Sequence, residues 1–384
     1  MIDLTNLKAA FVAKYRRDPR IFRAPGRINL IGEHTDYNEG FVLPAAIDFA
    51  TYVAGTARND RVIRVASVNF EHELEFNLDD EPIQADTWAK YAQGVALILE
   101  REGYRLRGAD LLIDSDVPVG AGLSSSAALE ISTAFALASL SGYRIDGMEL
   151  AKIGQTAEHE FARVRSGIMD QFASVFGQTN HALFLDCRSM EWEPIAVSNA
   201  QFVICNTKTK HDLAEGKYNK RRAECEAAAL FFGKQSLRDV TLDEFKARSA
   251  EMPEIPRKRA RHVITENDRV LGAIKALRSD DLAKFGMLMN ESHESLRVDF
   301  QVSSDELDLM VNLARGQTGV LGARMTGGGF GGCTINLMAQ GDHLQFVERM
   351  SENYYRVTGI IPDIYECEIG RGVCERPTVE NVSN

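Results

Sequence analysis

A junction between a strand and a helix reads Val117-Pro118-Val119-Gly120-Ala121-Gly122-Leu123-Ser124-Ser125-Ser126-Ala127. Its two glycines allow the backbone to come close to a ligand, and its three serines place hydroxyls beside the free N–H groups of a helix start. The positive end of the helix dipole favours an anion there. Helix capping by serine is the plainer interpretation. One serine is enough for a cap, so the loop Gly120–Ser126 favours phosphate binding.

The segments around this loop alternate between extended and helical patterns. Leu111–Asp114 and Ile21–Arg23 are typical of strands, and we expect the second to end in a turn at Pro25-Gly26. Ser124–Leu140 is rich in alanine and leucine and lacks proline, which predicts a buried helix. We therefore expect an α+β protein.

A chain of 384 residues suggests about two domains. Its composition changes near Glu193-Pro194, where long polar helical stretches and short strands begin. We expect one domain over residues 1–195 and a second over residues 196–384, which includes the glycine-rich run 327–332. The second domain should combine helices with a small antiparallel sheet.

The net charge of −11 makes nucleic acid and membrane surfaces poor default partners. The six cysteines form no C-x-x-C pair and no zinc spacing, which is typical of reduced thiols. The first residues lack the profile of a signal peptide, and no apolar run approaches the ~20 residues of a membrane span. We expect a cytoplasmic protein with no membrane partner.

Other nucleotide motifs are missing or out of place. The chain has no G-x-x-x-x-G-K-[ST] loop and no H-R-D or D-F-G motif. Gly327–Gly332 satisfies the letters G-x-G-x-x-G, but the strand-like Cys333–Leu337 follows where a dinucleotide fingerprint needs a helix. Five glycines in six residues are costly to order. We expect this run to approach a ligand or another loop closely.

A second cluster of polar residues lies between Arg23 and Asn38. Sugars are recognised by such clusters, because each hydroxyl both donates and accepts hydrogen bonds. Glu33, His34 and Asp36 could instead bind a metal, although their spacing matches no standard motif. A polar surface turn remains an equal alternative at this point.

Two carboxylates complete the set of candidates. Asp170 lies near the start of an expected helix and could accept a proton in phosphoryl transfer. Glu158, paired with a serine hydroxyl, could hold Mg²⁺, which takes few protein oxygens. Alone, each has a plainer interpretation as a solvated acid or a partner of the helix dipole. We interpret the basic run Arg257–Arg261, with Arg221 and Arg222, as solvated helix faces.

Taken together, three motifs resemble the galactokinase branch of the GHMP small-molecule kinase family. They are Gly26–Gly40, Pro118–Ser126 and Met325–Gly332. The first is the most specific, since other GHMP kinases share the other two. Ile28 and Glu39 stand where the signature often has valine and aspartate, and both keep the residue character.

This resemblance implies a two-domain GHMP kinase architecture. Its N-terminal domain would hold a mixed sheet with a left-handed βαβ phosphate-loop unit, its C-terminal domain would be ferredoxin-like, and the active site would lie between them. The implied reaction is transfer of the γ-phosphate of ATP to the C1 hydroxyl of α-D-galactose, the first step of galactose use by the Leloir pathway. ATP and Mg²⁺ are the implied cofactors, galactose and ATP the partners, and a monomer the assembly.

The same resemblance assigns roles to single residues. Asp170 matches the catalytic base, Arg27 the cation that stabilises the transferring group, and Ser126 and Glu158 the Mg²⁺ ligands. The matched sugar contacts are Glu33, His34, Thr35, Asp36 and Tyr218. The matched nucleotide contacts are Ser67, Gly120, Ala121, Gly122, Leu123, Ser124, Ser125 and Ser126.

Two alternatives stay open. A non-catalytic galactose sensor would bind sugar and ATP and regulate a partner, but relatives of that kind have a shortened phosphate loop, whereas Gly120–Ala128 is intact. A kinase of N-acetylgalactosamine or L-arabinose would keep the chemistry and change the acceptor. The block Glu33–Asp36 favours galactose.

Overall fold

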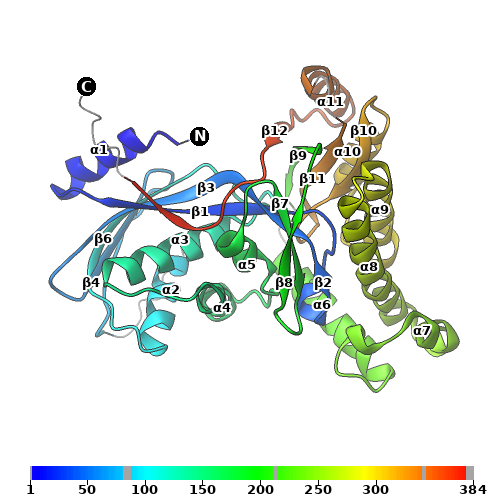
Figure 1. The fold of residues 1–384 in the computed structure, drawn as a ribbon, viewed down its shortest axis with the longest axis horizontal. Coiled ribbons are helices and arrows are strands. Elements are labelled where there is room, and N and C mark those ends of the chain that lie inside the picture. Colours follow the sequence, from blue (N-terminus) through cyan, green and yellow to red (C-terminus); the bar gives the residue numbers. More distant parts are fainter. Residues whose placement is uncertain (1, 81–87, 211–213, 340–342, 378–384) are drawn as a thin grey trace.

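The computed structural model describes residues 2–80, 88–210, 214–339 and 343–377 (Figure 1). The elements up to residue 196 are α1 (Leu4–Tyr15), β1 (Arg20–Asn29), β2 (Phe41–Val42), β3 (Pro44–Ala57), β4 (Val62–Ser67), β5 (Leu74–Asn77), α2 (Ala89–Arg101), β6 (Ala109–Ser115), α3 (Ser125–Leu140), α4 (Gly147–Ala157), the π-helix η2 (Glu158–Ala162), α5 (Met169–Phe176), β7 (His181–Asp186) and β8 (Trp192–Ala196). The later elements are β9 (Gln201–Lys210), α6 (Ala214–Phe231), α7 (Leu242–Arg248), α8 (Glu254–Arg278), α9 (Leu282–Ser295), the π-helix η5 (Leu296–Phe300), α10 (Asp305–Arg315), β10 (Val320–Met325), β11 (Gly331–Met338), α11 (His343–Thr358), β12 (Asp363–Cys367) and β13 (Cys374–Arg376).

The largest sheet has six strands in the order β13-β1-β3-β6-β4-β5, and a small separate sheet has the order β2-β7-β8. The strand pairs of the largest sheet are antiparallel except β4 with β6, which makes it a mixed sheet. Alternate residues of β1 face opposite sides, as strand geometry requires. Phe22 packs with α2 and α3, whereas Ile21 packs with α1 on the other face (Figure 1). The sheet is therefore covered on both sides.

The Pro25-Gly26 pair does not form the expected turn. β1 runs through it, and only the pairing register with β3 shifts between Pro25 and Arg27. A Cβ atom on Gly26 would lie 2.6 Å from the carbonyl oxygen of Leu123, and the Arg27 N–H donates to that same oxygen at 3.1 Å. The glycine thus lets the strand lie directly against the phosphate loop, which also places Arg27 there.

The second sheet has four antiparallel strands in the order β10-β11-β9-β12. Helices α6 to α10 connect β9 to β10, and α11 connects β11 to β12. This order and connection are those of a ferredoxin-like sheet, as the resemblance implies. Helices α10 and α11 cover one face through Met310 and Met350, and α9 covers the other through Phe285 and Met289.

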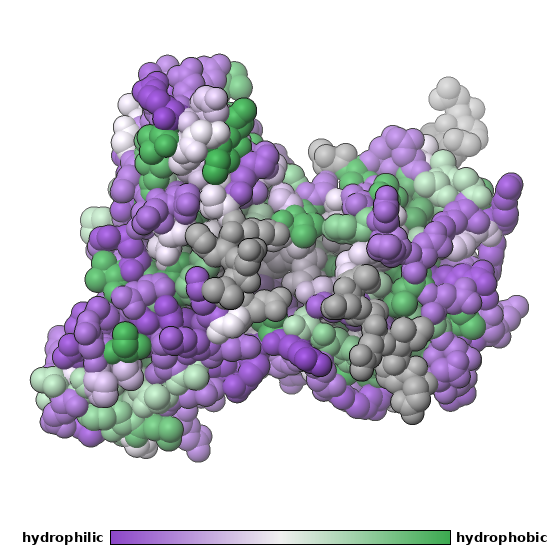
Figure 2. Space-filling view, turned by 180° about the vertical axis from the view of Figure 1, so that it is seen from behind, coloured by the Kyte–Doolittle hydropathy of each residue, from purple (hydrophilic) through white to green (hydrophobic). Residues whose placement is uncertain are grey.

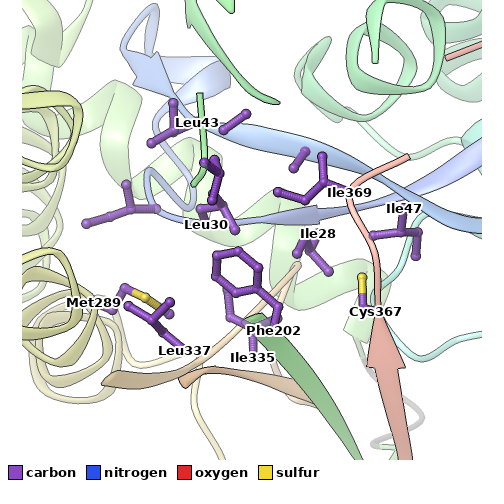
Figure 3. Close-up of a cluster of buried hydrophobic side chains, with 14 of the residues drawn as sticks. Ile28, Leu30, Leu43, Ile47, Phe202, Met289, Ile335, Leu337, Cys367 and Ile369 are labelled. Atoms are coloured by element: carbon purple, nitrogen blue, oxygen red, sulfur yellow. The ribbon is translucent and has the colours of Figure 1, made fainter. Parts of the chain in front are cut away.

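One hydrophobic core joins the two halves of the chain. Figure 3 shows Phe202 of β9 beside Ile28 and Leu30 of β1, with Leu337 and Met289 nearby. Burial of each such side chain contributes about 1.5–3 kcal/mol, so the halves are held together by packing. The division at residue 195 stays a prediction. The sheets do not follow it throughout, since β13 returns from the end of the chain to pair with β1.

Figure 2 shows a mostly hydrophilic face with small separate hydrophobic patches and a hollow between two lobes. In the described part of the chain, no helix has the length and apolar character needed to cross a membrane.

Candidate active site

The phosphate loop connects β6 to α3 and lies at the N-terminus of that helix. Gly120 and Gly122 adopt left-handed backbone angles, with φ of 67° and 79°, which glycine accepts without strain. Ser124 precedes the helix, which begins at Ser125 as predicted to within one residue. Ser125 and Ser126 line a pocket at this helix end. The free N–H groups of the first turn therefore face the place where an anion would bind.

This pocket, here called the nucleotide pocket, has a volume of about 400 Å³. Its walls include Ser67 and Gly120, whose assignment as nucleotide contacts stays a prediction, together with the aromatic side chains of Phe70, Trp88 and Tyr91. The rings of Phe70 and Trp88 stack at 24° with centroids 6.2 Å apart. No motif marks these aromatic residues in the sequence, and they were not predicted.

Arg27 and Asp170 form an ion pair next to the loop. The Arg27 Nη2 and Nε atoms lie 2.7 Å and 2.9 Å from Asp170 Oδ1. Arg27 Nη1 also donates to the Gly122 carbonyl at 2.7 Å, and the Ser124 hydroxyl donates to Asp170 Oδ2. Asp170 is the second residue of α5, so both of its oxygens are held by groups at or beside the loop.

Glu158 lies at the start of the π-helix η2, where α4 loses its regular hydrogen bonding. Such π-helical turns are frequent at functional sites. Glu158 Oε1 accepts a hydrogen bond from Ser126 at 3.2 Å, and Oε2 accepts from Ser166 at 2.5 Å and from Gln171 at 3.1 Å. Burial raises the pKa of Glu158 above its ordinary value.

A smaller cavity of about 120 Å³, here called the sugar cavity, has Arg27 and Asp170 in its wall. Both halves of the chain line it. The lining residues are Arg27, Glu33, His34, Asp36, Glu158, Val164, Ser166, Met169, Asp170, Tyr218, Gly327 and Gly328. The structure thus brings together Glu33, His34, Asp36 and Tyr218, which were predicted to share one site.

Burial shifts the pKa values of ionisable side chains in this cavity. Burial lowers the pKa of His34 to about 3, so the imidazole is neutral, and its Nδ1 lies 2.8 Å from the Tyr37 hydroxyl. Burial, followed by the charge of Asp170, raises the pKa of Asp36 to about 7. A cavity with several closely spaced acids and neutral donors suits a ligand with many hydroxyls.

Glu33 connects the sugar cavity to the glycine-rich run. Its Oε1 accepts from the Gly327 N–H at 2.8 Å and lies 3.5 Å from Arg324 Nη2. A Cβ atom on Gly327 would lie 2.8 Å from the Gly122 carbonyl oxygen, and one on Gly332 would lie 3.0 Å from the Ala121 carbonyl oxygen. The expected close approach of this run to another loop is confirmed, and the other loop is the phosphate loop.

Some predicted contacts do not line either space. Thr35 is buried, and its hydroxyl donates to the carbonyls of Gly32 and Phe41. Ala121 and Leu123 are buried in the core. These residues shape the loops, and their assignment as ligand contacts stays a prediction.

The interpretation of the basic residues as solvated helix faces is wrong for Arg259 and Arg221. Arg259 is 1% exposed and pairs with Glu224 at 2.7 Å. The Arg221 Nε atom donates to the Phe300 carbonyl at 2.8 Å. Arg259 Nη1 also donates to the Asp299 carbonyl at 2.5 Å. Both guanidinium groups therefore hold the end of η5, whose Phe300 ring packs on His34. A helical pattern alone could not predict this, because the acceptors are distant in sequence.

The donor set of Ser126 and Glu158 fits Mg²⁺. Among the described residues, no group of three or more His, Cys, Asp and Glu side chains could form a metal cage. Mg²⁺ is commonly held by one or two protein oxygens together with water and substrate phosphates. A carboxylate beside a serine hydroxyl at the phosphate loop provides such a pair.

Comparisons with known proteins agree with this geometry. The galactokinase galactose-binding signature matches residues 9–57, and the N- and C-terminal domain models of GHMP kinases match residues 90–178 and 273–356. A galactokinase of Roseiflexus sp. is 44% identical, with 97% of both chains covered, and one of Chloroflexus aurantiacus is 46% identical, with 97% of this chain and 98% of the relative covered.

Solved structures give the same result. Lactococcus lactis galactokinase complexed with galactose superposes with a TM-score of 0.92 at 38% identity, covering 97% of this chain and 100% of that one. Methanococcus jannaschii mevalonate kinase has a TM-score of 0.67 at 20% identity, with 93% of this chain and 100% of that chain covered, which shows the shared fold. The chain belongs to the galactokinase family, within the GHMP kinases.

Proposed function

We propose that the chain is a galactokinase that transfers the γ-phosphate of ATP to the C1 hydroxyl of α-D-galactose, giving α-D-galactose 1-phosphate and ADP. The observation that carries this proposal is the position of the Arg27–Asp170 pair. Both residues line the sugar cavity, while Arg27 also bonds the phosphate loop at Gly122 and Asp170 is bonded by Ser124. The pair therefore lies where a sugar hydroxyl would meet a phosphoryl group.

In this proposal Asp170 accepts the proton of the C1 hydroxyl. A loose transition state for phosphoryl transfer requires little early proton removal, so holding the hydroxyl in line contributes as much as basicity. Arg27 neutralises Asp170 in the free protein and stabilises the charge of the transferring group. Because Arg27 is only 4% exposed, its charge acts with little screening by water.

Glu33, His34, Asp36 and Tyr218 are the proposed sugar contacts. The proposed nucleotide contacts are Ser67 and the loop Gly120–Ser126, with Phe70, Trp88 and Tyr91 around the base. Ser126 and Glu158 are the proposed ligands of Mg²⁺, which would neutralise the phosphate charge when bound. A monomer is the proposed active form.

The sensor alternative lacks support in the geometry. Its relatives have a shortened phosphate loop, whereas the loop here is complete and packs against Gly327, and Asp170 is already paired with Arg27. A kinase of N-acetylgalactosamine or L-arabinose would use the same catalytic groups and would differ only in the sugar that accepts the phosphate.

The deciding experiment is an ADP-release assay with galactose, N-acetylgalactosamine, L-arabinose and glucose, with the product identified by ³¹P NMR. We expect the highest kcat/KM with galactose and a phosphate on C1. Turnover with N-acetylgalactosamine or L-arabinose well above that with galactose would show that galactose is not the preferred substrate. A lack of turnover with every sugar would favour the galactose sensor.

A further inference from the structure

A buried amide next to Asp170 links the elements that carry the proposed catalytic groups. Gln171 of α5 is fully buried, and its Nε2 donates to Glu158 Oε2 at 3.1 Å and to Glu130 Oε2 at 2.9 Å. Glu130 is also fully buried and lies four residues after Ser126 on α3, which is about one helical turn. The amide thus spans α3, α5 and η2.

The two oxygens of Glu158 have different surroundings. Oε2 accepts from both Ser166 and Gln171, whereas Oε1 faces the Ser126 hydroxyl. The Gln171 bond therefore keeps Oε2 turned inward and leaves Oε1 beside Ser126. A side-chain NH₂ group has two donor hydrogens, and two carboxylates use both, so the orientation of the amide is fixed.

Glu130 is an unusual residue for packing alone. It is 0% exposed within a helix whose buried positions are mainly alanine, isoleucine and leucine. Its Oε1 has no hydrogen-bond partner among the described residues. A buried polar group without full pairing costs roughly 1–3 kcal/mol, which an apolar side chain would avoid. Its bond to Gln171 is the interaction that an apolar residue could not make.

We propose that Gln171, held in turn by Glu130, is the positioning residue that orients Glu158 toward the divalent cation at Ser126. This inference rests on the proposed function, since it assumes the metal role of Ser126 and Glu158. Groups that orient metal ligands typically change metal affinity or activity by about 10- to 100-fold when they are removed.

The test replaces the amide by a side chain of similar shape, in Gln171→Met. Mn²⁺ binding is followed by electron paramagnetic resonance with a non-hydrolysable ATP analogue present. We expect the Mn²⁺ dissociation constant and the Mg²⁺ concentration for half-maximal turnover to rise about 10-fold or more, with the galactose KM within about 2-fold of wild type.

The matched control is Thr133→Val. Thr133 lies on α3, the helix that carries Glu130. It is fully buried, and its hydroxyl has no hydrogen-bond partner among the described residues. Removing that hydroxyl changes a buried polar group near Glu130 but leaves the amide bridge intact. We expect wild-type Mn²⁺ affinity.

A second pair of variants decides the question if Gln171→Met does not fold. Glu130→Gln keeps an acceptor for Gln171 and should bind Mn²⁺ as wild type does, whereas Glu130→Met lacks it and should bind several-fold more weakly. Thermal melting identifies any variant that is unfolded. Wild-type Mn²⁺ affinity in Gln171→Met or Glu130→Met overturns the positioning role. Absence of galactose phosphorylation by the wild-type protein overturns the proposed function instead.

Discussion

The sugar cavity and the nucleotide pocket are neighbours but are built differently. The cavity has about 120 Å³, draws residues from both halves of the chain, and is lined by charged side chains such as Arg27 and Glu33 that are at most 4% exposed. The pocket has about 400 Å³, is formed by residues 51–129 alone, and combines aromatic rings with a helix N-terminus. We therefore expect recognition in the cavity to depend on fixed charges, and recognition in the pocket to depend on stacking and backbone groups.

The largest effect should follow from a change where the two spaces meet. Asp170→Asn keeps the shape of the side chain but removes the proposed proton acceptor. We expect kcat to fall by about 10²- to 10⁴-fold. Galactose binding, measured by calorimetry on the same variant, should stay within a few-fold of wild type. Near-normal turnover would remove Asp170 from the role of base.

A change at the helix start should separate metal binding from sugar binding. Ser126→Ala removes the hydroxyl that lies 3.2 Å from Glu158. We expect the Mg²⁺ concentration for half-maximal activity to rise about 10-fold, since one of few protein oxygens is lost. Ser125→Ala is the control, because Ser125 lines the same pocket. An equal Mg²⁺ requirement in the two variants would contradict the assignment.

A change in the nucleotide pocket should leave the sugar cavity unaffected. Trp88→Ala removes a ring that would stack on the base, a loss of about 0.5–1.5 kcal/mol. The KM for ATP should therefore rise about 2- to 10-fold, while the KM for galactose stays unchanged. Trp192→Phe alters the other tryptophan, which packs with Phe172 and Phe176 instead. If both variants change the two KM values alike, the spaces are not independent.

The last effect is on stability and concerns the charge in the sugar cavity. The pKa of Asp36 rises from 3.8 to about 7 on folding, so its contribution to stability is complete below pH ~4 and is lost as the pH rises through ~7. Asp36→Asn removes this dependence. We expect the variant to gain up to about 4 kcal/mol over wild type at pH 8 and to lose that advantage toward pH 4. Denaturant unfolding across this range measures the difference; a gap independent of pH would contradict it.

The sequence predicted the local elements of the site better than their connections. Ser124–Leu140 and the glycine runs have patterns that physical rules interpret directly, and they appear where expected. The bond from Gly327 to Glu33 and the burial of Arg259 depend on contacts between residues far apart in the chain. The turn expected at Pro25-Gly26 was wrong because the space beside Gly26 is filled by the phosphate loop, which no local pattern reveals.

The same distinction holds for the ligand spaces. Side chains grouped in Gly26–Gly40 could be assigned to one site because they form a continuous segment that resembles a family signature. Phe70, Trp88 and Tyr91 come from segments without a motif, and only the fold brings them to Gly120. Ring stacking tolerates many sequence contexts, so the aromatic wall of the nucleotide pocket could not be predicted from sequence motifs, whereas its phosphate loop could.

The most direct test of the account is a crystal structure with galactose and a non-hydrolysable ATP analogue. The account predicts that the C1 hydroxyl lies about 2.6–3.2 Å from the Asp170 carboxylate. It also predicts a separation of about 3–3.5 Å between that hydroxyl and the γ-phosphorus, with Arg27 beside both. A sugar bound with another hydroxyl at Asp170, or bound away from the loop Gly120–Ser126, would contradict it.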